Sequence, residues 1–180
     1  EAEAEARKAL DILNTDAWAQ HALAHIMYFS GRNHQGLDLM LRLAPQWQDL
    51  MSFLYTHNWF HVALFQLDLD RFHDVIHTWD TRLWSQSTTE SSTVTFPLVN
   101  RANSQDQLGA AGILWKLELR LHRRAIILKQ QNHIDLNERW TSLANCIRLP
   151  TPHWDPLFDL ILTHTLLRVA RKQDAEAHIQ

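Results

Sequence analysis

Two histidine pairs stand out as residues whose type and spacing suit chemistry. His21 and His25 lie four residues apart in WAQHALAHIMYF, and His57 and His61 have the same spacing in HNWFHVALFQLDLD. Residues four apart on a helix share a face, with about 6 Å between them. Imidazole nitrogens bind zinc and other transition metals, and imidazole is also a common general base. If their helices are neighbours, the pairs predict a metal site or a His/Asp acid–base site.

Other side chains are candidates for the same site because they lie on similar helical faces. Tryptophans there suit an aromatic wall for a ligand, and carboxylates suit a partner for imidazole. The predicted ligand-binding residues are Trp18, His21, His25, Tyr28, His57, Trp59, His61, Asp106, Trp115 and Asp159. The simpler interpretation, that these histidines and tryptophans are packed in a helical core, stays open. With neither an H-E-x-x-H motif nor a cysteine among them, no catalytic residue is assigned, and a transition metal is the one cofactor that the pattern admits.

The composition favours a helical protein without nucleic-acid or membrane partners. Only 4 glycines and 5 prolines occur in 180 residues, and no glycine-rich phosphate-binding motif is present. The formal net charge is −3 and the basic residues are scattered, which argues against nucleic-acid binding. No apolar run approaches the ~18 residues of a membrane span. A single cysteine and no visible secretory signal lead us to expect a cytoplasmic protein.

Apolar residues at helical spacing predict helices along the chain, separated by turn signals. Asp16 or Thr15 is the expected N-cap of the second helix, Gly31 its C-terminal glycine, and Asn33 the cap of the third. The Asp155-Pro156 pair predicts another start. The predicted helices cover residues 1–13, 17–29, 34–43, 48–69, 72–82, 106–121, 135–147 and 157–171, with a last one beginning at 174. Residues 85–105 are rich in Ser and Thr and predict an irregular insertion.

A repeated helix–turn–helix pattern predicts how these helices are arranged. Ala24 and Gly36 are small residues at the positions where two helices of a tetratricopeptide unit approach closely, and Asp70 follows Gly31 by 39 residues at the equivalent turn. The expected fold is an all-α solenoid of antiparallel helix hairpins, forming a right-handed superhelix as one domain over residues 1–180. In such a fold the first helix of each hairpin lines a concave groove.

Several segments together resemble the tetratricopeptide repeat protein 38 family. They are HALAH, HNWFHVALFQLDLD, QLGAAGILWKLEL, ERWTSLA and FDLILTH, and they span most of the chain. Members of that family are longer than 180 residues, so the resemblance implies a fragment of a longer protein. The chain departs from the family pattern at Asp70, at Ile161 and over residues 121–133. The resemblance implies a fold and no particular reaction.

Two functions follow as alternatives from these patterns. The first is a tetratricopeptide-like scaffold that binds a peptide or a small polar ligand in a groove lined by His and Trp. The second is a metal-dependent or His/Asp acid–base enzyme that uses the same histidines. The expected partner is therefore a protein, a peptide or a small molecule, and the sequence does not indicate an oligomeric state.

Overall fold

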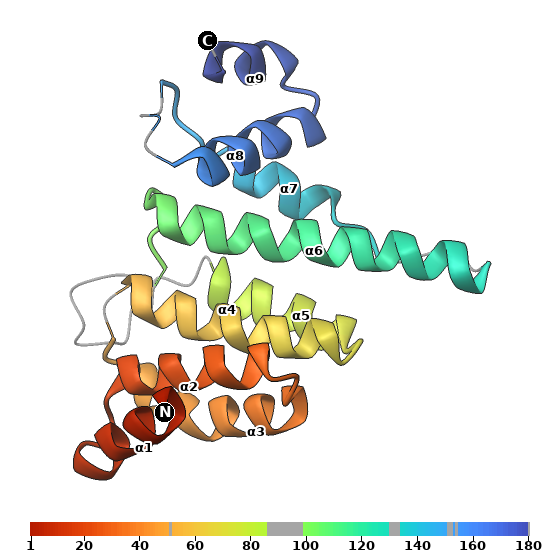
Figure 1. Cartoon of the computed structure of the whole chain (residues 1–180). Coiled ribbons are helices and arrows are strands. Elements are labelled where there is room, and N and C mark those ends of the chain that lie inside the picture. The colour runs from red at the N-terminus through yellow and green to blue at the C-terminus, as the bar shows by residue number, and fades with distance from the viewer. Residues whose placement is uncertain (51, 86–98, 130–133, 151–152, 154, 180) are drawn as a thin grey trace. The chain divides into compact units, whose positions relative to one another are not determined.

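The computed structural model describes residues 1–50, 52–85, 99–129, 134–150, 153 and 155–179 (Figure 1). Over these residues the secondary structure is helical and contains no strand, which confirms the predicted all-α class. The chain divides into two compact units, residues 1–100 and 101–180, and each is described by itself. The predicted superhelix and the single domain over residues 1–180 stay predictions.

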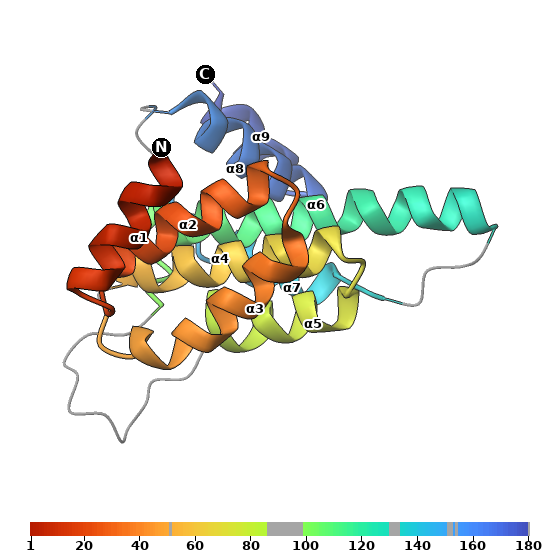
Figure 2. The same cartoon turned by 60° about the horizontal axis from the view of Figure 1, so that its bottom comes forward.

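The first unit contains five α-helices and two short turns of other helical types in its described part. These elements are α1 (Ala2–Ile12), α2 (Ala17–Phe29), α3 (Asn33–Leu43), the 3₁₀ turn η1 (Ala44–Trp47), α4 (Ser52–Asp68), α5 (Phe72–Thr78) and the π-helical turn η2 (Trp79–Leu83). Helix α2 packs on α1, α3 and α4, and α4 packs on α2, α3 and α5. Figure 1 shows α2 and α4 side by side, and Figure 2 shows α3 and α5 on the same side of them. The two helices that carry the histidine pairs are thus neighbours.

The second unit is built around α8. Its helices are α6 (Ser104–Leu128), α7 (Asn137–Ala144), α8 (Pro156–Arg168) and α9 (Lys172–His178). Helix α8 packs on α6, α7 and α9. An apolar cluster joins α8 to α9 and to the segment after α7, and it comprises Ile147, Phe158, Leu162, Leu166 and Ala175.

Aspartate and asparagine caps set several helix starts. Asp16 Oδ1 accepts hydrogen bonds from the backbone N–H groups of Trp18 and Ala19 at 2.9 and 3.1 Å, as predicted. Asp155 caps α8 in the same way. Asn103 caps α6, so this helix begins at Ser104, inside the range predicted to be irregular, and it continues to Leu128. Of that range, residues 86–98 lie outside the described residues.

Three of the helix hairpins turn through the same backbone geometry. The last residue of each turn before the next helix's cap has a positive φ: Gly31 (70°), Asp70 (56°) and Ala170 (60°). In each turn the following N–H bonds to a carbonyl five residues back, in the bonds Arg32 N to Met27 O, Arg71 N to Gln66 O and Arg171 N to Leu166 O, all 2.9 Å long. The predicted equivalence of Asp70 and Gly31 is confirmed. The predicted Asn33 cap is wrong, because this turn places Arg32 at the cap and Asn33 inside α3.

Gly36 permits a close contact between α3 and α4. A Cβ atom at this position would lie 2.3 Å from Cζ of Phe65, which is far inside van der Waals contact. The small residue predicted from the repeat pattern therefore meets an aromatic ring of the neighbouring helix. This contact helps to fix α4, which carries His57 and His61.

The structure contains no candidate for a membrane-spanning helix within its described residues. None of these helices is both long and apolar enough to cross a lipid bilayer.

Candidate metal centre

A buried polar network fixes α2 close to its histidines. The Gln20 side chain is fully buried, and its Oε1 accepts a hydrogen bond of 2.7 Å from Nε1 of Trp47. Its Nε2 donates to Oε1 of Gln46 and to the carbonyl of Asn14. Because Gln20 directly precedes His21, these bonds hold the backbone from which the first imidazole projects.

His21, His25, His57 and His61 form one group, called here the four-histidine cluster. One ring nitrogen from each residue lies within 4.8 Å of the corresponding nitrogens of the other three. Across the helix pair, the ring centroids of His25 and His61 are 4.4 Å apart and those of His21 and His57 are 4.8 Å apart. The predicted helical spacing thus brings both pairs together, with His57 and His61 on the side of α4 that faces α2.

The cluster is half-buried as a whole and closed at His61. His61 is 2% exposed, whereas the other three rings are partly accessible to solvent. Neither ring nitrogen of His61 has a hydrogen-bond partner among the residues that the structure describes. The Nε2 atoms of His21 and His25 are 2.9 Å apart, within hydrogen-bond distance of each other. In the described part of the chain, His61 therefore packs against the other imidazoles and bonds to no carboxylate or carbonyl.

Burial keeps these imidazoles in their neutral form. It lowers the pKa of His61 from 6.5 to about 2 and the pKa of His57 to about 4, and repulsion from the neighbouring imidazolium forms adds to both effects. The pKa of His21 falls to about 4 for the same reasons, and burial lowers the pKa of His25. Neutral imidazole is the form that binds a metal ion, so protons compete weakly for this site.

The spacing of the nitrogens suits a single ion. Zinc binds imidazole nitrogen at about 2.0–2.1 Å in a tetrahedron, which places the ligand nitrogens about 3.3 Å from one another. The ligand nitrogens of the four-histidine cluster lie within 4.8 Å of one another, and the Nε2 atoms of His21 and His25 are 2.9 Å apart, so small side-chain rotations would bring all four to one point. An all-imidazole set also suits copper and nickel.

Exposed and half-buried aromatic rings surround the imidazoles. Trp18 contacts the ring of His21 edge-on at 5.7 Å and is 58% exposed, and Phe29 stacks on His25 at 6.0 Å. On α4, Phe53 and Phe60 lie 5.1 and 5.6 Å from the ring of His57. The sequence analysis identified Trp18 but missed Phe53 and Phe60 of α4. Their spacing of three or four residues from a histidine was the available signal.

The other predicted residues of the first unit lie away from the imidazole rings that they were expected to join. Tyr28 packs edge-on against Phe65 at 5.9 Å, one turn beyond His25. Trp59 is 8% exposed and packs against Trp47 at 5.3 Å, with the Arg82 guanidinium 4.9 Å above its ring. Trp59 thus contributes to the core of the unit.

Asp106, Trp115 and Asp159 belong to the second unit. Asp106 is 2% exposed in the first turn of α6. Trp115 stacks on His164 of α8, with ring centroids 4.3 Å apart and an angle of 12° between the planes. Burial lowers the pKa of His164, Glu118 opposes this effect, and Arg168 adds to it. Asp159 contacts two histidines, His153 and His178, which the sequence analysis did not connect with it.

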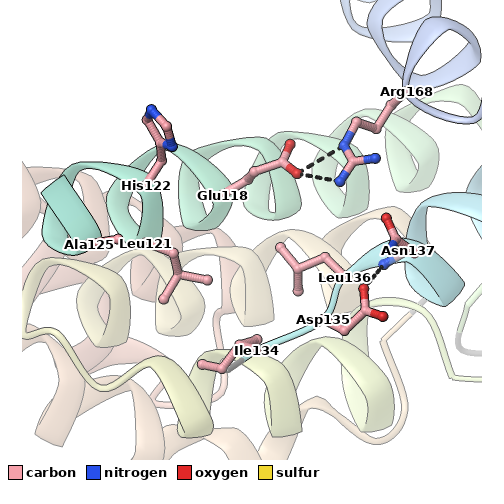
Figure 3. A pocket seen from close by; sticks show the side chains of 9 residues that line it. All are labelled: Glu118, Leu121, His122, Ala125, Ile134, Asp135, Leu136, Asn137 and Arg168. Carbon is pink, nitrogen blue, oxygen red and sulfur yellow. Dashed lines mark hydrogen bonds and ion pairs between the residues drawn. The ribbon is translucent and has the colours of Figure 1, made fainter. Parts of the chain in front are cut away.

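A pocket of about 250 Å³ opens between α6, the segment before α7, and α8 (Figure 3). Glu118 and Arg168 form an ion pair of 2.8 Å at its edge, and Figure 3 also shows the Asp135 carboxylate turned onto the backbone of Asn137. None of the predicted site residues lines it. Two of its charged side chains, Glu118 and Arg168, are already paired with each other.

No protein-family model matches the chain, and no solved structure matches it. The resemblance to the tetratricopeptide repeat protein 38 family accordingly stays a prediction, and the chemistry of the candidate site is argued from its own geometry.

Proposed function

We propose that the four-histidine cluster binds one divalent transition-metal ion, which links α2 to α4. The observation that carries this proposal is His61, buried at 2% exposure with no hydrogen-bond partner for either ring nitrogen within the described parts of the chain. An unsatisfied buried polar group costs about 1–3 kcal/mol. Three further neutral imidazoles within 4.8 Å make a metal ion the partner that satisfies His61.

A core-packing role explains the cluster less well. Packed histidines normally donate to a carbonyl or a carboxylate and accept from a donor, since buried polar groups are paired. Here His21 and His25 can share one imidazole–imidazole hydrogen bond at 2.9 Å, but neither ring nitrogen of His61 is paired within the described residues. A cation between the four rings would use the lone pair of His61. Four protein ligands complete a tetrahedral shell, which is the arrangement of a structural metal site. We therefore assign the ion a stabilising role and no reaction.

Zinc binding by paired variants tests the proposal. The full chain is stripped of metal and reloaded with Zn²⁺, and bound zinc is counted by elemental analysis after gel filtration. His57→Ala/His61→Ala and His21→Ala/His25→Ala should each bind one equivalent less than the wild type. The matched control is His73→Ala/His77→Ala, because these two histidines have the same spacing on α5 and are exposed. Equal metal loss from the control, or none from the cluster variants, would contradict the proposal.

The single variant His61→Leu separates metal binding from folding. Without metal it should raise the free energy of unfolding by about 1–3 kcal/mol, because an apolar side chain replaces an unsatisfied buried one. With Zn²⁺ at about 100 times its Kd, the wild type should gain about 2.7 kcal/mol that the variant does not. Urea unfolding with and without Zn²⁺ measures both effects. A variant that is less stable than wild type even without metal would indicate a packing role instead.

A binding groove is the second candidate function, and the exposed aromatic rings favour it. Phe29 is 82% exposed and Trp18 58% exposed, on either side of His21 and His25 along α2. Rings of this kind suit a peptide or a small polar ligand. Trp18→Ala and Phe29→Ala should leave metal content unchanged. If they abolish binding of a peptide that the wild type holds without metal, the groove is the better assignment.

A further inference from the structure

Three residues of the second unit form another group of metal-ligand type, called here the His–Asp–His cluster. His153 precedes α8, Asp159 lies in the first turn of α8, and His178 is the last residue of α9. One ligand atom from each lies within 4.8 Å of those of the other two. This group shares no residue with the four-histidine cluster.

The geometry of Asp159 is that of a carboxylate between two imidazoles. Its Oδ2 lies 3.1 Å from Nδ1 of His153, and its Oδ1 lies 3.4 Å from Nε2 of His178. Oδ1 is buried, and it accepts no hydrogen bond within the described residues, although an imidazole nitrogen is so close. The two atoms face each other without hydrogen-bond alignment. Two ligands of the same cation are arranged in this way.

The fold fixes the buried part of this group. The His178 ring is buried, and Ala175, one turn earlier on α9, belongs to the apolar cluster that includes Phe158 next to Asp159. The turn between α8 and α9 is held by Arg171, whose Nη1 donates to the carbonyl of Ala144 at 2.6 Å. Asp159 and His178 are therefore presented by packed helices, which limits the movement needed to bind an ion.

The group is closed on one side and open on the other. His153 is exposed, Asp159 is half-buried and His178 is buried. The rings of His153 and His178 are nearly parallel, at 26°, with centroids 4.9 Å apart. Two imidazoles and one carboxylate offer three ligands and one negative charge, and an ion bound by three protein ligands keeps a position for water.

We propose that His153, Asp159 and His178 bind a second divalent transition-metal ion and leave at least one coordination position to water. Sites with two histidines and one carboxylate hold zinc or iron when positions are left open. The open position would face the exposed His153 side, where a small ligand can reach it. The proposal does not depend on metal binding by the four-histidine cluster.

The test uses the full chain in the His57→Ala/His61→Ala background, which removes the first site. Metal-free protein is loaded with Zn²⁺, and bound zinc is counted after gel filtration. This background should still bind one equivalent of zinc. Adding His153→Ala or Asp159→Asn should remove that equivalent, because the affinity for zinc falls at least about 100-fold. His122→Ala is the matched control, because His122 is exposed on α6 of the same unit. His153 is exposed, so its variant should keep the helical circular dichroism of its parent.

Cobalt substitution tests the open position separately. Co²⁺ bound here should keep at least one water ligand, so added azide should replace it and change the visible absorption spectrum. If zinc content is unchanged in His153→Ala and Asp159→Asn, or falls equally in His122→Ala, the second site does not exist. If the wild type binds one zinc equivalent that depends on His153 and Asp159 but none that depends on His61, the proposal for the four-histidine cluster fails and this one stands.

Discussion

Between α2 and α4 the first unit packs imidazole against imidazole, whereas between α6 and α8 the second unit packs imidazole against indole. In the first unit the rings of His25 and His61 meet at 4.4 Å, and in the second His164 stacks on Trp115 at 4.3 Å. The separations are alike and the chemistry is different. Each arrangement leaves buried ring nitrogens without a hydrogen-bond partner among the described residues, Nε2 of His164 in the second unit and both nitrogens of His61 in the first. His61 has three further imidazoles within 4.8 Å with which it can share a cation, whereas His164 packs on indole rings.

The two candidate metal sites differ in the number and the charge of their ligands. The His–Asp–His cluster includes a carboxylate, which supplies charge for an ion and leaves coordination positions open. The four-histidine cluster has four neutral ligands and no carboxylate among them, which fills a tetrahedral shell. The comparison teaches that ligand number and ligand charge, rather than the presence of histidine, separate a closed site from an open one.

Acid sensitivity should distinguish the two helix pairs most strongly. The folded pKa values of His21 and His57, about 4, lie below the 6.5 of an unperturbed histidine. Between these pH values the unfolded chain binds more protons, so stability is present above about pH 6.5 and is lost as the pH falls towards 4. A shift of this size corresponds to about 3 kcal/mol for a buried group, and we expect about half of it for each of these partly exposed rings.

Urea unfolding of metal-free protein from about pH 7 to about pH 4.5 measures this difference. His21→Gln/His57→Gln should flatten the pH dependence considerably, because two of the four imidazoles with a lowered pKa are removed. His164→Gln, in the second unit, removes one such group and should flatten it less. An equal effect of the two variants would show that imidazole packing in the first unit is no more strained than stacking on Trp115.

Gly36→Ala should affect the first unit alone. The added Cβ would meet Phe65 at 2.3 Å and force α3 away from α4, which we expect to cost about 2 kcal/mol of stability. Since α4 carries His57 and His61, zinc affinity at the four-histidine cluster should fall as well. Zinc binding at the His–Asp–His cluster should be unaffected. Thermal unfolding and zinc titration measure the two effects, and unchanged zinc binding would show that the cluster does not depend on this helix contact.

The sequence predicted the helices and the first cluster for a common reason, which is that both follow from periodicity. Residues four apart share a helical face, so His21 with His25 and His57 with His61 were visible as pairs before their helices were known to touch. His178 was not visible, because it reaches Asp159 only through the turn between α8 and α9. No regular sequence spacing relates His178 or the exposed His153 to Asp159, so periodicity could not connect the three residues.

The boundaries that the sequence missed come from turn geometry. Asn33 is a good capping residue, but the turn after α2 uses Gly31 and Arg32, and the hydrogen bond from Arg32 N to Met27 O sets the next helix start. Trp59 was expected near a ligand and instead packs beneath Arg82, because tertiary packing decides which side of a helix is buried. Periodicity gives the face of a helix, and the partner of that face comes from the fold.

The shared hairpin turn allows the smallest and most symmetrical comparison of the two units. The turn holds Gly31 at φ 70° in the first unit and Ala170 at φ 60° in the second. A side chain in this left-handed region costs roughly 1 kcal/mol relative to glycine. Ala170→Gly should therefore stabilise the chain by about 1 kcal/mol. Gly31→Ala should destabilise it by a similar amount, from the backbone conformation alone, because no atom lies within 4 Å of a Cβ built on Gly31 and the added methyl group would meet no clash. Urea unfolding of both variants measures the pair, and changes of the same sign would mean that the two turns, although alike in backbone, are held by different forces.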